Sequence, residues 1–172
     1  MSKLIQIEPA DRRLLASIAS TMEEAARKSG DWLVCRPGCN QCCLGPFEIT
    51  PLDAHRLRLG LTQTDPANAA QIKARLAAYV PHDDAPCPAL NPHSGLCDLY
   101  EFRPITCRVF GPVTYTDDGL AACELCYTGA SEQQMAACAV HIDPEGLEAA
   151  ILLQLNDDTP TTVAAALKPL CS

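Results

Sequence analysis

The cysteines are the residues of this sequence with the clearest capacity for chemistry. The 172-residue chain contains 11 cysteines, and seven of them fall into two tight groups. The first group has the spacing Cys-x3-Cys-x2-Cys-Cys, and the second follows further along the chain. The seven are Cys35, Cys39, Cys42, Cys43, Cys87, Cys97 and Cys107. Thiols this dense form disulfides, bind a metal or carry out redox chemistry.

The sequence favours metal binding over disulfides. Its first residues contain no apolar run of signal-peptide length, and no run reaches the roughly 18 apolar residues of a membrane-spanning helix. We therefore expect a cytoplasmic protein without a membrane partner, and thiols stay reduced in the cytoplasm. The odd number of cysteines also fits a disulfide scaffold poorly.

The spacing of the first group is typical of metal ligands. Two residues between Cys39 and Cys42 let both sulfurs reach one ion while backbone N–H groups point at them. Adjacent side chains tend to diverge, so Cys43 serves a second metal or a polynuclear cluster, or else packs in the core. Cys35 is a ligand or a bystander. A closed site needs about four ligands, and the second group supplies up to three more, Cys87, Cys97 and Cys107.

A further pair at ligand spacing, Cys123-x2-Cys126, stands nearer the carboxyl end. It completes the main site, forms half of a second site, or acts as a redox dithiol. The remaining cysteines are interpreted as non-ligands. Cys138 lies among alanines in a predicted helix, and Cys171 lies at a terminus.

Arginines stand beside the cysteines in a chain whose net charge is −8. Bound thiolates carry excess negative charge that nearby cations or N–H dipoles must offset. We expect this role for Arg103 and Arg108, whereas Arg36 is equally well explained as a surface residue. His93 lies near Cys97 and is interpreted as a loop residue rather than a ligand. No motif identifies catalytic residues.

The composition narrows the functional class. No run of basic residues is present, which argues against a nucleic-acid partner, while a protein partner stays open. Hydrophobic residues make up 48% of the chain, an ordinary value for a globular protein. We expect a single Cys-rich metal-binding domain over residues 1–172, with a motif core at about 35–110 and a helical part at about 131–170.

Local signals predict a mainly α fold in which helices pack irregular Cys-rich, metal-centred loops. A capping residue followed by proline recurs at Thr50-Pro51, Asp65-Pro66, Asp143-Pro144 and Thr159-Pro160, a pattern typical of helix starts. A capping box is expected between Ser131 and Gln134. Residues 112–120 predict one short β-hairpin with Asp118-Gly119 in its turn. Helices are predicted at about 9–29, 51–59, 66–80, 131–140, 144–155 and 160–168.

The cysteine blocks resemble a family of bacterial cysteine-cluster proteins described as zinc- or iron-chelating domains. The residues that carry the resemblance are Cys35, Cys39, Cys42 and Cys43, then Cys87, Pro88 and Leu90, then Gly95, Cys97, Leu99, Tyr100, Arg103, Pro104, Cys107, Arg108 and Phe110. A similar cluster occurs in flagellin lysine N-methylase, a larger protein. The resemblance implies metal or iron–sulfur binding through the matched cysteines and supplies no reaction.

These observations predict a cytoplasmic protein that holds an iron–sulfur cluster or zinc in a redox, sensory or structural role. The alternatives are a methyltransferase-like, protein-modifying enzyme supported by a cluster, or a structural zinc module that binds a partner. A simple structural zinc site requires neither adjacent cysteines nor residues such as Tyr100 and Arg103 beside its ligands. Their presence favours an iron–sulfur cluster such as 4Fe–4S. The candidate ligands are Cys35, Cys39, Cys42, Cys43, Cys87, Cys97, Cys107, Cys123 and Cys126.

Overall fold

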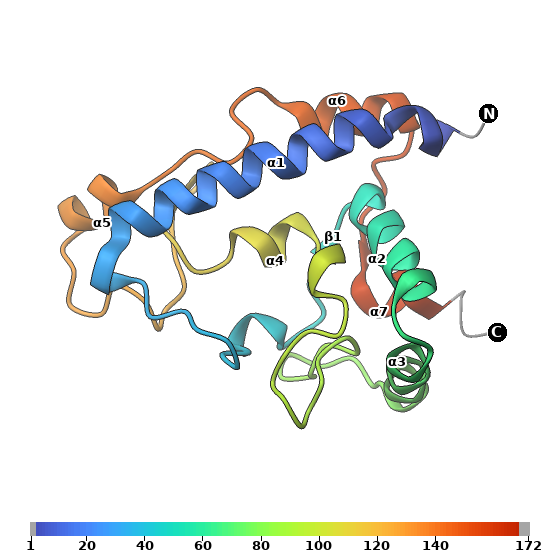
Figure 1. Ribbon diagram of the computed structural model, residues 1–172. Helices are drawn as coiled ribbons and strands as arrows, with labels where there is room; N and C mark the ends of the chain where they lie inside the picture. The colour runs from blue at the N-terminus through green and yellow to red at the C-terminus, as the bar shows by residue number, and fades with distance from the viewer. Residues whose placement is uncertain (1–2, 169–172) are drawn as a thin grey trace. The chain divides into compact units, whose positions relative to one another are not determined.

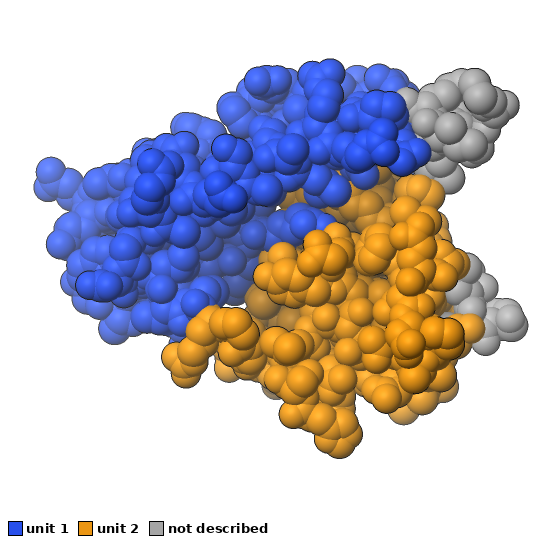
Figure 2. Space-filling model, viewed as in Figure 1, with its two compact units in different colours: residues 1–35, 108–157 blue, residues 36–107, 158–172 orange. Residues whose placement is uncertain are grey.

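Helices dominate the computed structural model of the protein, which describes residues 3–168 (Figure 1). The predicted mainly α class is confirmed. The chain forms two compact units, each built from two separate stretches: Met1–Cys35 with Arg108–Asp157, and Arg36–Cys107 with Asp158–Ser172 (Figure 2). We call them unit 1 and unit 2. The expectation of a single domain stays a prediction. No helix among the described residues is long and apolar enough to cross a membrane.

Unit 1 is built on the long helix α1 (Lys3–Ser29), which contacts α5 (Glu132–Cys138) and lies beside α6 (Leu147–Leu155) (Figure 1). Burial follows the predicted helical spacing at Leu14, Ile18 and Ala25. The predicted start at Pro9 was wrong, because the helix extends to Lys3 and buries Ile7 to 2% exposure. The short 3-10 turn η1 (Gly30–Trp32) follows, and Gly30 adopts the left-handed φ of +49° expected at a helix end.

The predicted hairpin is present in unit 1, with a different turn. Strands β2 (Thr114–Thr116) and β3 (Gly119–Ala121) pair antiparallel with Thr116 opposite Gly119. The turn is therefore Asp117-Asp118, and Gly119 opens the second strand with a φ of +116°. The left-handed backbone that glycine permits is thus used one position later than expected.

Several loops of unit 1 meet around Tyr127, whose hydroxyl is buried. The Tyr127 oxygen accepts the backbone N–H of Val113 at 3.2 Å and lies 2.5 Å from the Ser29 hydroxyl, which in turn contacts the Ala25 carbonyl at 2.6 Å. Cys138 is buried at the end of α5, 3.3 Å from the Lys28 carbonyl. The buried members of this core cluster are Val113, Cys123, Cys126, Tyr127, Cys138 and Ala139.

Unit 2 packs α2 (Pro51–Gln63), α3 (Pro66–Ala78) and α7 (Val163–Leu167) around an aliphatic core. Its two-stranded sheet joins distant stretches, since β1 (Glu48–Ile49) pairs antiparallel with β4 (Thr161–Thr162). The cysteines lie on and between the 3-10 turns η2 (Gln41–Cys43) and η3 (Tyr100–Phe102) and the helix α4 (Ile105–Val109). Cys171 lies outside the described residues.

Two of the four predicted cap-proline starts open helices. The Thr50 side chain accepts the N–H of Asp53, and that of Asp65 accepts the N–H of Ala67. The capping box between Ser131 and Gln134 is also present. The other two predicted starts were wrong, because contacts within the fold move the helix beginnings. Asp143 lies before α6 in the chain, and its carboxylate accepts the N–H groups of Leu147 and Glu148 in the first turn of that helix. Thr161–Thr162 pair with β1, and α7 begins after them at Val163.

Candidate metal centre

Five partly buried cysteines of unit 2 come together from separate stretches of backbone. Their sulfurs are close enough for charge on one to act on others: Cys107 is affected by Cys42, Cys87 and Cys97, and Cys43 by Cys87 and Cys97. Cys42 and Cys43 end η2, Cys87 follows α3, Cys97 precedes η3 and Cys107 lies in α4. Segments distant in sequence therefore converge on one thiol cluster, defined as Cys42, Cys43, Cys87, Cys97 and Cys107.

Backbone pairing aligns three of these segments. The N–H of Cys87 donates to the Cys43 carbonyl at 2.7 Å, and Gly45 donates to Ala85 at 2.9 Å. A β-bridge joins Leu90 to Cys97. Because backbone hydrogen bonds fix register, the first cysteine group lies beside Cys87, and the stretch after Cys87 lies beside Cys97. The thiols are thus held on backbone paired at short range rather than on separate flexible loops.

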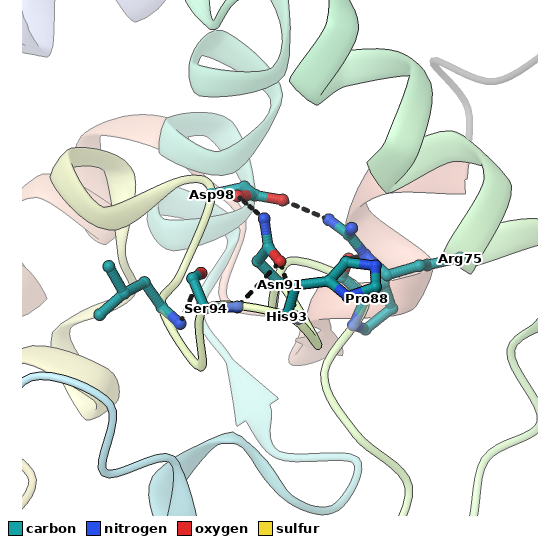
Figure 3. A network of polar contacts seen from close by, with 7 residues as sticks. Arg75, Pro88, Asn91, His93, Ser94 and Asp98 are labelled. Carbon is teal, nitrogen blue, oxygen red and sulfur yellow. Dashed lines mark hydrogen bonds and ion pairs between the residues drawn. The ribbon is translucent and has the colours of Figure 1, made fainter.

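The side chain of Arg75, from α3, ties two of these segments together (Figure 3). Its Nε donates to the Pro88 carbonyl at 2.7 Å, and a terminal nitrogen donates to the Asp98 carboxylate at 2.6 Å. These acceptors directly follow Cys87 and Cys97 in the chain. One planar guanidinium, with several donors in a rigid arrangement, therefore sets the spacing of both cysteine segments against a helix.

The intervening loop is closed by the same network (Figure 3). The amide of Asn91 donates to the Asp98 carboxylate at 3.3 Å, and its carbonyl oxygen accepts the N–H of His93 at 3.0 Å and that of Ser94 at 3.3 Å. His93 is an exposed residue of this loop. Its placement agrees with the interpretation of His93 as a loop residue.

A buried carboxylate positions the helix that carries Cys107. Asp53 of α2 accepts the N–H of Ile105, the first residue of α4, at 3.0 Å and pairs with Arg56 at 2.5 Å. Both side chains of this ion pair are almost fully buried. Burial raises the pKa of the Asp53 carboxyl, while Arg56 and the backbone N–H groups of Ile105 and Thr50 oppose that rise. Asp53 thus fixes α4, and with it Cys107, to α2.

Two glycines allow close approach beside the cysteines. A Cβ on Gly60 would lie 2.5 Å from the ring of Phe102, so η3 seats its aromatic residue directly on the α2 backbone. The predicted end of α2 at Leu59 was too early, because the helix continues through Gly60 to Gln63. Gly95, with a φ of +69°, brings the loop before Cys97 against Gly38, whose carbonyl oxygen would lie 3.2 Å from an added Cβ. The Cys39 loop therefore lies beside the Cys97 loop.

The adjacent thiols Cys42 and Cys43 interact instead of diverging. The Cys43 thiol acts as a hydrogen-bond donor toward the Cys42 sulfur. This donation lowers the pKa of Cys42 to about 6 and raises the pKa of Cys43. The expectation that their side chains point apart was wrong, because the two thiols are hydrogen-bonded to each other within the 3-10 turn η2.

Burial and backbone N–H donors determine the pKa values of the other thiols of the cluster. Burial, with nearby thiolate charge, raises the pKa of Cys87 to about 11 and that of Cys107 to about 12, and burial also raises the pKa of Cys97. The N–H groups of Ala89 and Leu90 point at the Cys87 sulfur, and that of Leu99 points at Cys97. Such N–H donors stabilise the anionic sulfur that a metal needs.

Arg103 supplies positive charge to the cluster, as predicted. Its guanidinium carbon lies 3.4 Å from the centre of the Tyr100 ring, and its Nε donates to the Tyr100 carbonyl at 2.9 Å. From this position its charge lowers the pKa values of Cys42 and Cys97 against the effect of burial on each. Tyr100 is exposed, so this cation–π pair lies at the protein surface.

The remaining predicted ligands divide between the units. Cys39 is exposed in unit 2, and its ligand role stays a prediction. Cys35, Cys123 and Cys126 belong to unit 1. Among the residues that the structure describes, no three His, Cys, Asp or Glu side chains stand close enough together, as placed, to hold an ion. The full ligand set therefore remains a prediction that rests on convergence and donor chemistry.

Sequence reasoning missed the residues that position the thiols. Arg75 and Asp53 contact partners far away in sequence, and neither stands next to a cysteine. A weak signal was available for Asp53, which occupies the capping-box position three residues after Thr50. A carboxylate has two oxygens, so the buried Asp53 side chain can accept hydrogen bonds in addition to those of the cap. One of its oxygens accepts the backbone N–H of Ile105.

The donor set suits zinc and iron. Thiolates select zinc and iron–sulfur clusters, whereas magnesium and calcium prefer oxygen ligands. A family model described as "CxxCxxCC: Putative zinc- or iron-chelating domain" matches residues 34–140, more than half of the 172-residue chain. Neither a curated protein nor a solved structure matches the chain. The matched span contains the whole thiol cluster and extends past Phe110, where the sequence motifs end. The chain therefore belongs to the CxxCxxCC family of zinc- or iron-chelating domains.

Proposed function

We propose that unit 2 holds a thiolate-bound iron–sulfur cluster in a redox or sensory role. The ligands come from Cys42, Cys43, Cys87, Cys97 and Cys107, with Cys39 as a further donor beside them. The observation that carries the proposal is the convergence of these five partly buried sulfurs within reach of each other's charge. Neighbouring sulfurs and burial disfavour ionisation of these thiols, and a bound metal ion stabilises the thiolate form that they otherwise avoid.

The number of thiols favours a cluster over a single zinc ion. A closed zinc site uses about four protein ligands, and five sulfurs already converge here. The interacting pair Cys42 and Cys43 offers two sulfurs from one turn, an arrangement that suits a polynuclear centre. A 4Fe–4S cluster takes about four thiolates, and the remaining thiol can tune the cluster by hydrogen bonding. Zinc in the same place would act structurally.

The protein residues supply charge balance and shielding. A bound cluster supplies one-electron transfer. The backbone N–H groups of Ala89, Leu90 and Leu99, with the Arg103 guanidinium, stabilise the sulfur charge. Burial of the thiols limits access of water and oxygen. A reducing compartment keeps such thiols available for metal, so we also propose a cytoplasmic location.

Removal of one ligand tests this proposal. Cys97→Ser should lose iron and the visible absorption of the purified protein together, because serine is a poor ligand for these metals. The matched control is Cys138→Ser, which alters a buried cysteine of unit 1 and should keep both. Full iron occupancy in Cys97→Ser would show that Cys97 is no ligand and would reject the cluster built around it. Equal loss in the control would mean that the loss reports folding rather than ligation.

A further inference from the structure

The turn that begins at Cys123 in unit 1 repeats the geometry of the turn that begins at Cys87. In the Cys87 turn, the N–H groups of Ala89 and Leu90 point at the Cys87 sulfur, and the Leu90 N–H also donates to the Cys87 carbonyl at 2.9 Å. In the Cys123 turn, the N–H groups of Leu125 and Cys126 point at the Cys123 sulfur, and Cys126 donates to the Cys123 carbonyl at 2.9 Å. The two units therefore contain the same sulfur-binding turn.

One difference makes the turn of unit 1 a two-sulfur element. The residue three positions after the first cysteine is Leu90 in unit 2 but Cys126 in unit 1. A second thiol therefore stands where the Cys87 turn has a leucine. The two thiols interact, as the Cys126 side chain forms a hydrogen bond with the Cys123 sulfur. Their exposed fractions are only 6% and 5%. Two thiolates with a divalent ion make a neutral group, which an apolar surrounding accepts far better than free charge.

A third sulfur of unit 1, that of Cys35, lies beside Gly111, a residue that also contacts the Cys123 turn. A Cβ on Gly111 would lie 3.0 Å from the Cys35 sulfur, and the φ of Gly111 is +120°. The carbonyl of the same glycine accepts the N–H of Cys123 at 3.2 Å. Gly111 thus lies next to both Cys35 and the Cys123 turn. The Cys35 side chain is exposed, so a reagent in solution can reach its sulfur.

We propose that Cys35, Cys123 and Cys126 form a second thiolate site, which binds one thiophilic ion such as Zn²⁺ within unit 1. The cluster of unit 2 uses other cysteines, so this site goes beyond the function proposed above. The N–H groups at Cys123 offset part of the charge of three thiolates. Three protein ligands leave one position of tetrahedral zinc for water or another small donor. The adjacent turn residue Tyr127 anchors the pair to the core through its contacts with Ser29 and Val113.

The test uses the exposure of Cys35 as its readout. Zinc should slow alkylation of Cys35 by iodoacetamide in the full-length chain, measured by peptide mass spectrometry after a short pulse. The double variant Cys123→Ser/Cys126→Ser should abolish that protection and bind about one equivalent less Zn²⁺ or Co²⁺ than the wild type. Cys138→Ser is the matched control, because Cys138 is buried in the same core cluster yet stands outside the turn; it should keep both the protection and the equivalent.

A Cys97→Ser background separates this site from the centre of unit 2. In that background, the metal equivalent bound by unit 1 and the protection of Cys35 from alkylation should persist, even if the unit 2 proposal itself fails. Zinc-independent alkylation of Cys35 in the wild type would overturn the second site. Unchanged metal stoichiometry in the double variant would overturn it too, as would a Cys123–Cys126 disulfide in anaerobically purified protein. If the double variant does not fold, Cys35→Ser provides the stoichiometric test, because its side chain is exposed.

Discussion

Arg75 and Asp98 form an ion pair of 2.6 Å that ties α3 to the residue after Cys97. Because the same guanidinium also donates to the Pro88 carbonyl at 2.7 Å, one side chain holds the segments of two cysteines. The sulfurs of Cys87 and Cys97 are therefore set in place by a helix that carries no thiol. We therefore expect metal affinity to depend on Arg75, although its side chain carries no thiol.

Replacement of Arg75 should reduce metal retention well beyond the effect of a control substitution that costs similar folding stability. Arg75→Gln removes the ion pair and one carbonyl contact and should cost about 1–3 kcal/mol of folding stability. Arg75→Lys should fail to restore metal retention, because a single ammonium cannot reproduce the planar, two-acceptor contact. Chelator competition would measure retention, and urea denaturation would measure stability. The control is Arg58→Gln, which removes a similar 2.8 Å bond to the Ala166 carbonyl. Equal loss of metal in both variants would contradict the positioning role.

The Asp53–Arg56 pair should matter for both stability and Cys107. Asp53→Asn leaves the Arg56 charge buried without its counter-ion and should destabilise the protein by roughly 3 kcal/mol. It also weakens the bond to the Ile105 N–H that fixes α4. The control Asp65→Asn changes an exposed N-cap, where asparagine caps as well as aspartate, and should cost less than about 0.5 kcal/mol. Thermal unfolding of the two variants would decide. A wild-type stability for Asp53→Asn would show that the buried pair contributes nothing.

The contact between Gly60 and Phe102 predicts a steric effect. Gly60→Ala places a methyl group 2.5 Å from the Phe102 ring, so the ring and η3 must shift. The expected loss is about 1–3 kcal/mol, although alanine is the better helix former. Leu59→Ala, at an exposed neighbouring position of α2, should change stability little. A more stable Gly60→Ala protein would mean that η3 does not pack on α2 as described.

Metal uptake by the thiol cluster should release protons and tighten as pH rises. Burial and neighbouring thiolates raise the pKa of Cys87 to about 11 and that of Cys107 to about 12. A raised thiol pKa means that the proton is still bound at neutral pH, so a metal must displace it. We expect release of about two protons from these residues, and affinity rising about 100-fold per pH unit between about pH 7 and 8. A pH indicator in weak buffer measures the release. Uptake without proton release would contradict these protonation states.

Much of the thiol cluster was predictable because its signals are local. The spacing of the two cysteine groups predicted that cysteines from both converge, and five of the seven form the thiol cluster, without Cys35 and Cys39. The helix caps at Thr50 and Asp65 depend only on residues within one turn. The Arg103 assignment was predictable from its place beside Cys107 in an acidic chain. Local chemistry of this kind is the part of a fold that sequence expresses directly.

The rest depends on which of several local caps the chain uses and on contacts between distant segments. Asp143-Pro144 and Thr159-Pro160 have the same local pattern as the true helix starts, yet capping from ahead of α6 and the pairing of β4 with β1 move the helices away from them. Arg75 donates to a backbone carbonyl, and every residue carries such an acceptor, so no residue type marks the partner. The placement of Cys35, Cys123 and Cys126 in unit 1 likewise follows from chain path rather than spacing.

The metal centre of unit 2 is tested most directly by the metal and sulfide content of the protein purified without oxygen, recorded with its visible spectrum. We predict iron with acid-labile sulfide, and a broad visible absorption that disappears when air bleaches the cluster. Zinc alone, with no colour, would retain the thiol site and reject the cluster. A folded protein with neither metal, whose unit 2 thiols all react rapidly with an alkylating reagent, would contradict the proposal that these five sulfurs hold a metal.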